Sequence, residues 1–576
     1  MAKASKSRTW ILLLIFAVGI FFVSRLFAGG TPVEISEGST LVIELGGGYV
    51  EAAAASPLAR LAGDRTRPFL GLLSMFRVAE RDDRISTVVI RIQPLDVGWG
   101  KADEIREAID RLQGQGKLTI AYLEIANFSS NRELFIASAA DEVYVSPGSV
   151  VPLVGLAAEY LFLGGFWEKL GVDWDIAKAG RYKSAVELHS QRTMSEASRE
   201  MADSLLDDTY RRFVEGIASG RGLTTADVVA AIDTGSVRSQ RLEALGLIDG
   251  EIHLDQLLER HGEVVRDADY ASVDPREVGF EAKGQIALVY GTGPVVQGEA
   301  TASPFDMSPV FASETVGRAI VDAAEDPKIA AIVLRIDSPG GSALASEVIW
   351  RSIERAKAKG KPVIASFSDV AASGGYYVAA AADAIVADPG TLTGSIGVFA
   401  LRPAVGGLLE KLEIGIDSLT RGRHADFLLS SERMSPAAHA RLQTSVLDTY
   451  QLFLTRVSDG RGLSLEEVDE RGQGRVWTGD QAFEQGLVDE LGGIYTAVRR
   501  AKVAAGLNAE DDVYLVPFPG QKTLGEQLLE AFQVTALRAS GSDFDWPKPL
   551  DQIVAWSKVL PSEGLQLIPP ALVEVR

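Results

Sequence analysis

Short, almost unbroken apolar runs recur along the chain, and each is followed by a longer stretch in which apolar residues return every three or four positions. The short runs predict buried strands of a parallel sheet, and the longer stretches predict amphipathic helices that cover it. The runs that we interpret as strands are TLVIEL from Thr40, KLTIAYLE from Lys117, QIALVY from Gln285 and KPVIASF from Lys361. Their alternation with helices predicts an α/β fold.

Two of the amphipathic stretches are long, and they begin at Ser195 and Ser435. A serine in this place is a favoured N-cap, because its hydroxyl accepts a hydrogen bond from a free N–H of the first helical turn. The two stretches also resemble each other, since DTYRRFVEGIASGRGLT at Asp208 returns as DTYQLFLTRVSDGRGLS at Asp448, 240 residues later. This likeness indicates an internal repeat.

Three further blocks repeat in the same order and at nearly the same distance. They are STVVIRI with AAIVLRI, FIASAADEVYVSPG with YVAAAADAIVADPG, and GLID with GLVD. The near-constant offset predicts a duplicated domain of about 240 residues. We place copy one at residues 38–275 and copy two at residues 282–518, and we have no chemical interpretation of the tail at residues 519–576.

The N-terminal end has the pattern of a membrane anchor. Fourteen unbroken apolar residues cover Trp10–Val23, and counting on to Ala28 gives nineteen, close to the ~20 that a transmembrane helix needs. We predict a transmembrane anchor at residues 9–28. Because basic residues precede it, we expect residues 1–8 in the cytoplasm and the bulk of the chain on the periplasmic side of a bacterial inner membrane. A cleaved signal peptide is the alternative, although the residues before Ala28 make a poor cleavage site.

Composition narrows the chemistry that the two copies can carry. A net charge of −21 without a basic cluster argues against nucleic acid as a partner. The chain has no cysteine, which excludes a thiol nucleophile, a thiolate metal site and disulfides. Neither GxxxxGK[ST] nor GxGxxG after a strand is present, which argues against a nucleotide phosphate loop.

The two copies differ at the positions where chemistry is expected. In copy two the third strand leads to AASGGYY and then to an alanine-rich stretch that predicts a helix, so Ser373 stands at the turn between them. Copy one has Asn131 at the matching position. Conversely, KAGRYKSAVE of copy one carries Lys183 where copy two has Ala425, with His424 beside it. Each copy retains what the other lacks.

This complementary pattern suggests a Ser–Lys pair divided between the copies. A serine hydroxyl needs a general base before it can attack an amide, and lysine can serve once burial lowers its pKa from about 10.4 to about 7–8. None of the five histidines stands in a recognisable Ser–His–Asp pattern, and Ser373 lacks the GxSxG context. The alternatives are an N-cap role for Ser373, an ordinary solvated Lys183 or one that pairs with Glu187, and His424 as a surrogate base.

Glycines near this serine predict an oxyanion hole. The tetrahedral intermediate of acyl transfer carries an oxyanion, which two backbone N–H groups can stabilise. Gly374 directly follows Ser373, and Gly340 and Gly341 belong to the motif SPGG at the end of another strand. We expect one donor from Gly374 and the second from Gly341 or Gly340. The alternative for SPGG is an ordinary turn before a helix.

Four motifs together carry a family resemblance: SPGGS, AASGGYY, TLTGSIGVF and YKSAVE. In this order they resemble the signal peptide peptidase A (protease IV) family, peptidase family S49, in its long, duplicated, membrane-anchored bacterial form. The resemblance implies tandem Clp protease/crotonase-like domains, with Ser373 as nucleophile, Lys183 as base and Ser395 orienting the lysine amine. It also implies a homotetramer around an apolar cavity, no metal or other cofactor, and substrates that are cleaved signal peptides and other extended hydrophobic segments.

Two other functions fit the same fold. A crotonase-like acyl-CoA enzyme would use the same oxyanion hole, but an extracytoplasmic location argues against CoA. A non-enzymatic membrane scaffold would have no need of the retained serine, lysine and glycine pair. We therefore expect a serine endopeptidase that contacts inner-membrane lipid and binds a hydrophobic peptide as an added strand beside Ser373 and Gly341.

Overall fold

The part of the chain that the computed structural model describes comprises residues 34–51, 67–126, 130–235, 238–300, 309–422, 424–520 and 566–567. The predicted anchor at residues 9–28 and most of the predicted tail at residues 519–576 lie outside these residues. Within them, no helix has both the length and the apolar character needed to cross a membrane.

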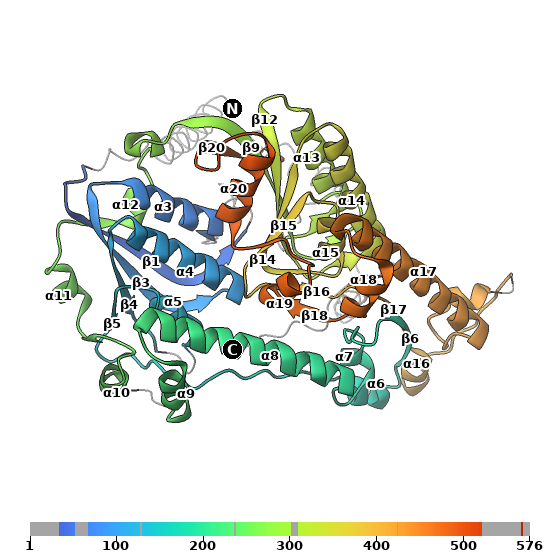
Figure 1. The fold of residues 1–576 in the computed structure, drawn as a ribbon. Coiled ribbons are helices and arrows are strands. Elements are labelled where there is room, and N and C mark those ends of the chain that lie inside the picture. The colour runs from blue at the N-terminus through green and yellow to red at the C-terminus, as the bar shows by residue number, and fades with distance from the viewer. Residues whose placement is uncertain are drawn as a thin grey trace, which may run out of the picture.

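Copy one contains the first sheet, whose seven strands all pair in parallel (Figure 1). In sheet order the strands are β2 (Arg67–Pro68), β1 (Ser39–Val50), β3 (Ile85–Asp96), β4 (Leu118–Leu123), β5 (Glu142–Val145) and β7 (Gly250–Glu251), with β8 (Val264–Arg266) also paired to β1. The strands predicted from Thr40 and Lys117 are β1 and β4, which confirms the interpretation of continuous apolar runs as buried parallel strands.

Copy two contains the second sheet, which is parallel except where β16 meets β18. In sheet order its strands are β18 (Val476–Thr478), β16 (Leu392–Gly394), β14 (Val363–Ala372), β12 (Ile329–Ser338), β9 (Ala282–Thr292) and β20 (Asp512–Phe518), with β15 (Ala384–Ala387) between β14 and β19 (Glu490–Leu491). The strands predicted from Gln285 and Lys361 are β9 and β14.

A third sheet joins the copies. Its strands, in order, are β11 (Phe311–Ala312), β10 (Val295–Val296), β13 (Gly341–Ser342), β21 (Gln566–Leu567), β17 (Val398–Ala404) and β6 (Asp173–Ala179). Strand β6 of copy one pairs antiparallel with β17 of copy two along its whole length, from Ala179 opposite Val398 to Asp173 opposite Ala404. This pairing carries the segment that follows β6 into copy two.

The helices follow a similar order in the two copies. Those of copy one are α3 (Phe69–Arg81), α4 (Trp99–Gly114), α5 (Asn131–Ala137), α6 (Gly164–Leu170), α7 (Glu187–Ser190), α8 (Glu196–Arg221), α9 (Thr225–Asp233), α10 (Ser239–Ala244), α11 (Leu254–Leu258), α12 (Asp267–Tyr270) and η1 (Pro275–Val278). Those of copy two are α13 (Ser313–Glu325), α14 (Ala343–Ala358), α15 (Gly374–Ala379), α16 (Gly406–Lys411), η2 (Ala425–Leu428), α17 (Pro436–Arg461), α18 (Leu465–Arg471), α19 (Gly479–Glu484) and α20 (Ile494–Ala504).

Two of these helices, α8 and α17, are the long helices predicted from the repeat. Ser195 and Ser435 cap them by accepting a hydrogen bond from the backbone three residues on, as predicted. Helix α8 runs along one edge of the molecule from copy one to copy two (Figure 1). By contrast, the alanine-rich stretch after Ser373 is not one helix, because α15 ends at Ala379 and β15 follows.

The copies share a hydrophobic core. One face of the first sheet packs against α3 and α4, and the same apolar cluster continues into copy two through α20 and one face of β9, β12 and β14. The opposite face of the second sheet packs against α13, α14, α15 and α17 in a second cluster. Burial across the boundary fixes the copies against each other, so a site divided between them can be preorganised.

Candidate active site

Ser373 and Ser395 come directly after the ends of two paired strands. Strands β14 and β16 run side by side with Ala372 opposite Gly394, so the next residue of each strand is one of these serines. Both side chains are fully buried. Their φ angles are 55° and 53°, a left-handed conformation that costs a residue other than glycine about 1–3 kcal/mol. Strain of this kind at two adjacent buried serines marks the place as a candidate site.

The hydroxyl of Ser373 does not cap the helix that follows it. Ser373 occupies the N-cap position of α15, but its side chain accepts no hydrogen bond from the first helical turn. The N-cap alternative is therefore wrong for this serine. In copy one, Asn131, which matches Ser373 by the repeat offset, begins α5 and donates to the carbonyl of Gly155. The N-cap residue of α5 is Ser130, whose buried hydroxyl donates to the carbonyl of Pro152.

Lys183 reaches copy two on the turn that follows β6. The N–H of Tyr182 donates to the carbonyl of Gln473 at 2.8 Å, which holds this turn against copy two. A Cβ added at Gly180 would lie 2.5 Å from the same carbonyl, and a Cβ added at Gly474 would lie 2.6 Å from the backbone nitrogen of Lys183. Glycine at both positions permits the two backbones to approach so closely.

The amine of Lys183 meets both serines. Its Nζ lies 2.7 Å from Ser373 Oγ, 2.9 Å from Ser395 Oγ and 2.9 Å from the Ser395 carbonyl oxygen. The lysine is fully buried, and burial lowers its pKa well below the ordinary value with no carboxylate to oppose the effect. The alternative of a solvated Lys183 is therefore wrong. The alternative of a Lys183–Glu187 pair is also wrong, because Glu187 accepts hydrogen bonds from Ser195.

The predicted oxyanion-hole glycines lie together. A Cβ added at Gly374 would lie 3.0 Å from the nitrogen of Gly341 and 3.2 Å from the Cα of Gly340, so the two loops are in contact. The N–H of Gly340 already donates to Ser338 Oγ at 3.2 Å. Gly374 and Gly341 are therefore the better pair of donors for a developing oxyanion.

His424 is not part of this cluster. It is exposed at the start of η2, and no hydrogen bond joins it to Ser373 in the part of the chain that the structure describes. His189 packs on Trp174, and His439 bonds the carbonyl of Ile176. Among the described residues, Lys183 and not a histidine is hydrogen-bonded to the hydroxyl of Ser373.

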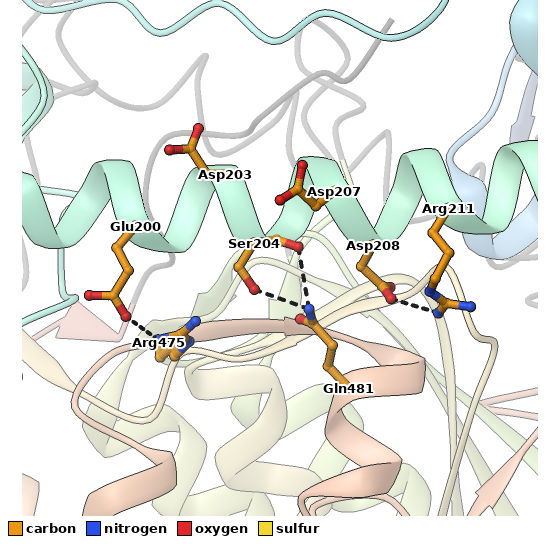
Figure 2. Close-up of a pocket in the computed structure, with 8 residues that line it drawn as sticks. All are labelled: Glu200, Asp203, Ser204, Asp207, Asp208, Arg211, Arg475 and Gln481. Carbon is orange, nitrogen blue, oxygen red and sulfur yellow. Dashed lines mark hydrogen bonds and ion pairs between the residues drawn. The ribbon is translucent and has the colours of Figure 1, made fainter. Parts of the chain in front are cut away.

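A group of polar contacts behind the lysine was not foreseen from the sequence. Figure 2 shows Glu200 of α8 directed at Arg475 and Ser204 directed at Gln481, at distances of 2.8 and 3.1 Å. They line an open hollow of about 570 Å³ between α8 and copy two. The carbonyl of Arg475 accepts the N–H of Ser395, so these contacts support the site from behind. Their members are far apart in sequence, and no local pattern links them.

Comparisons with a family model and with curated relatives indicate the same peptidase family. Residues 113–266 and 355–508 match Peptidase family S49, and the two matched segments are displaced by 242 residues, as the repeat predicts. The chain is 36% identical over 456 residues to "Serine protease SPPA, chloroplastic" of Arabidopsis thaliana, covering 77% of this chain and 66% of that protein. It is 30% identical over 533 residues to "Protease 4" of Salmonella typhi, covering 86% and 83%.

A solved structure of a mutant of the 1510-N membrane-bound stomatin-specific protease is also similar, at 19% identity and a TM-score of 0.27. The match covers 41% of this chain and 100% of that chain.

Proposed function

The chain belongs to peptidase family S49 and is a serine protease, and we propose that it cleaves peptides with Ser373 as nucleophile and Lys183 as general base. One observation carries this proposal: the buried amine of copy one lies 2.7 Å from the buried hydroxyl of copy two. That distance is within the reach a general base requires. Neither group is engaged by a helix cap or by a carboxylate.

The hydrogen bonds of Lys183 support a neutral amine that acts as a base. A neutral amine has two N–H groups and one lone pair. The carbonyl of Ser395 can only accept, so it takes one N–H, and Ser395 Oγ can take the other. The lone pair is then left for the proton of Ser373. In this arrangement Ser395 orients the amine and Lys183 draws the proton from the nucleophile.

The reaction then follows the course of acyl transfer. Ser373 Oγ attacks the peptide carbonyl, its proton passes to Lys183 Nζ, and the oxyanion forms beside the N–H groups of Gly374 and Gly341. The lysine ammonium returns the proton to the leaving amine, which breaks the C–N bond and leaves an acyl-enzyme. A water molecule then attacks this ester and gives a proton to the same amine. The amine passes this proton to Ser373 Oγ as the ester C–O bond breaks and the carboxylic acid is released.

An extended peptide is the substrate form that the sheet favours. The chain's own segment β21 inserts between β13 and β17, with Leu567 opposite Gly341 and Gln566 opposite Ser342 and Phe399. Both pairings are antiparallel. A strand in this place runs past the proposed oxyanion hole, so its carbonyls pass close to Ser373, as in substrate binding by strand addition. We include extended hydrophobic peptides, such as cleaved signal peptides, in the proposal.

Membrane association and assembly are also part of the proposal. The apolar run at residues 9–28 supports a single-pass anchor with the catalytic bulk on the periplasmic side. Exposed apolar side chains after α16 support contact with lipid or with other copies in a homotetramer. They are Leu412 (59% exposed), Ile414 (49%), Ile416 (51%) and Leu419 (92%).

Hydrolysis of a quenched fluorescent hydrophobic peptide tests the function. Ser373→Ala and Lys183→Met should each lower kcat by at least ~10³-fold, because each removes a member of a group that acts as a unit. Circular dichroism and the elution volume should stay those of the wild type. Normal turnover by either folded variant would refute the pair.

A further inference from the structure

The first turn of α4, in copy one, contacts copy two near the carboxyl ends of β12 and β14. Its Lys101 is 3% exposed. The Lys101 ammonium donates to Asp337 of β12 at 2.8 Å and to Asp369 of β14 at 2.7 Å, and it lies 3.2 Å from Glu51 of copy one. One side chain of copy one therefore bridges two strands of copy two.

The backbone of the same turn is bonded to copy two as well. Asp369 accepts the N–H groups of Gly98 and Lys101 at 3.0 and 2.9 Å, so a carboxylate of copy two caps a helix of copy one. A Cβ added at Gly98 would lie 2.3 Å from Asp369 Cγ, and one added at Gly100 would lie 2.7 Å from the carbonyl oxygen of Ser368. The contact thus depends on glycine at both positions.

Lys101 differs from Lys183 in its charge. Burial alone would lower the pKa of Lys101, but the carboxylates of Asp369, Asp337 and Glu51 outweigh burial and raise this pKa well above the ordinary value. The ammonium therefore stays charged, whereas the amine of Lys183 has no such partners. Copy one therefore supplies two buried lysines to copy two, one with a lowered pKa beside Ser373 and one with a raised pKa between Asp337 and Asp369.

The bridge lies at an irregularity between the two strands that lead to the reacting groups. Strands β12 and β14 are in register at Ile336 opposite Phe367, and the next pair is Ser338 opposite Ala371. Asp337 therefore faces a bulge of three residues, and its carboxylate accepts the N–H of Val370 at 3.2 Å. Lys101 joins the two sides of this bulge.

The proposed reacting groups follow a short distance beyond the bulge. Gly341 comes four residues after Asp337, and Ser373 comes four residues after Asp369. The separation of the two strand ends therefore sets the separation of oxyanion donor and nucleophile.

The segment that carries Lys101 has a counterpart in copy two. The segment from β3 to α4 in copy one matches the segment from β12 to α14 in copy two. In copy two this segment holds the SPGG motif, and in copy one it holds VGWGK, ending at Lys101. The segment of copy one that matches SPGG instead contacts Asp337 and Asp369 of copy two.

We propose that Lys101 is a positioning residue that holds Gly341 and Ser373 at the separation the transition state requires. The proposal rests on the proposed function of this site. Lys101 is hydrogen-bonded to neither Ser373 nor Lys183, so it acts through Asp337 and Asp369. Its effect should fall on the transition state, and it should leave peptide binding and the pKa of the base unchanged.

The test compares Lys101→Met with Lys117→Met in the full chain. Lys117 is also buried, at 8% exposure, but among the described residues its ammonium donates to the carbonyls of Asp82 and Ile85, both within copy one. Lys101→Met should lower kcat by ~10–100-fold, because a misplacement of about 1 Å costs up to ~10²-fold. KM and the midpoint of the pH–rate profile should match the wild type. Lys117→Met should lower the melting temperature without lowering kcat.

A second variant separates positioning from the cost of unpaired buried charge. Lys101→Met with Asp337→Asn and Asp369→Asn removes the ammonium and both carboxylates of copy two, and it leaves Glu51 paired with Arg335. This variant should regain stability over Lys101→Met while its kcat stays low. The proposal is overturned if Lys101→Met has the same kcat as Lys117→Met. If Lys101→Met does not fold and the triple variant does, the same comparison is made with the triple variant. A rise in KM with unchanged kcat would also overturn it.

A fluorophosphonate probe keeps this result separate from the proposed function. The probe phosphonylates an activated serine and needs no peptide substrate, and its rate should fall in Lys101→Met by the same factor as kcat. Wild-type protein that reacts with the probe but cleaves no peptide would refute the proposed function alone. Equal labelling rates in wild type and Lys101→Met would refute the role of Lys101 alone.

Discussion

Gly474→Ala tests whether copy two holds Lys183 in place from behind. The new Cβ would lie 2.6 Å from the backbone nitrogen of Lys183 and 2.7 Å from its Cα. Reaching an ordinary contact of 3.4 Å requires a shift of roughly 0.8 Å. If the amine follows its backbone, its 2.7 Å contact with Ser373 lengthens to about 3.5 Å, beyond a normal hydrogen bond. We expect kcat to fall by about 10²-fold, the cost of a misplacement near 1 Å.

Gly462→Ala is the matched control for this substitution. Gly462 ends α17 with φ of 67°, close to the 79° of Gly474, but a Cβ there meets no atom within 4 Å. Both variants should lose about 1–2 kcal/mol of stability from the left-handed conformation, measured by urea unfolding. Only Gly474→Ala should lose activity against the fluorescent peptide. Full activity in Gly474→Ala, or equal loss in Gly462→Ala, would refute the reasoning.

Three further predictions follow, two on pH dependence and one on the C-terminal segment. Because burial lowers the pKa of Lys183 well below its ordinary value, kcat/KM should rise with pH through that lowered pKa, and a flat profile would exclude a titrating lysine. Between the lowered pKa of Lys183 in the folded protein and the ordinary value of about 10.4, this lysine is protonated in the unfolded state and not in the folded state. The free energy of unfolding should therefore rise with pH over this range, and it should not rise in this way in Lys183→Met. Because β21 occupies the place proposed for substrate, a chain ending at Gly520 should show a lower KM with unchanged kcat. The KM should fall in proportion to the fraction of full-length molecules in which β21 leaves this place free. An unchanged KM would mean that this segment does not compete with peptide.

The differences between the two copies identified the candidate site residues in the sequence. Ser373 and Lys183 are 190 residues apart, and each is unremarkable in its local context. The complementary loss at Asn131 and Ala425 pointed to both residues, and the structure places their side chains in hydrogen-bond contact. The alternation of apolar runs predicted β1, β4, β9 and β14, because strands buried on both faces are continuous in hydrophobicity.

The end of α15, strand β6 and the contacts of Lys101 could not be predicted from local sequence patterns. The stretch after Ser373 is alanine-rich and buried except at Asp383, so it lacks the periodicity that would separate α15 from β15. Strand β6 mixes aspartate and lysine with apolar residues and forms by pairing with a distant strand of copy two. The role of Lys101 depends on two carboxylates more than 230 residues away. Contacts of this kind arise from tertiary packing between distant residues, so no local sequence pattern predicts them.

The rate of fluorophosphonate labelling at Ser373, mapped by peptide mass and compared between wild type and Lys183→Met, tests the central claim most directly. The account predicts labelling of Ser373 in the wild type, at a rate that rises with pH, and no labelling in folded Lys183→Met. Labelling of Lys183→Met at the wild-type rate, or labelling of another serine, would contradict the claim that an amine of copy one activates the hydroxyl of copy two.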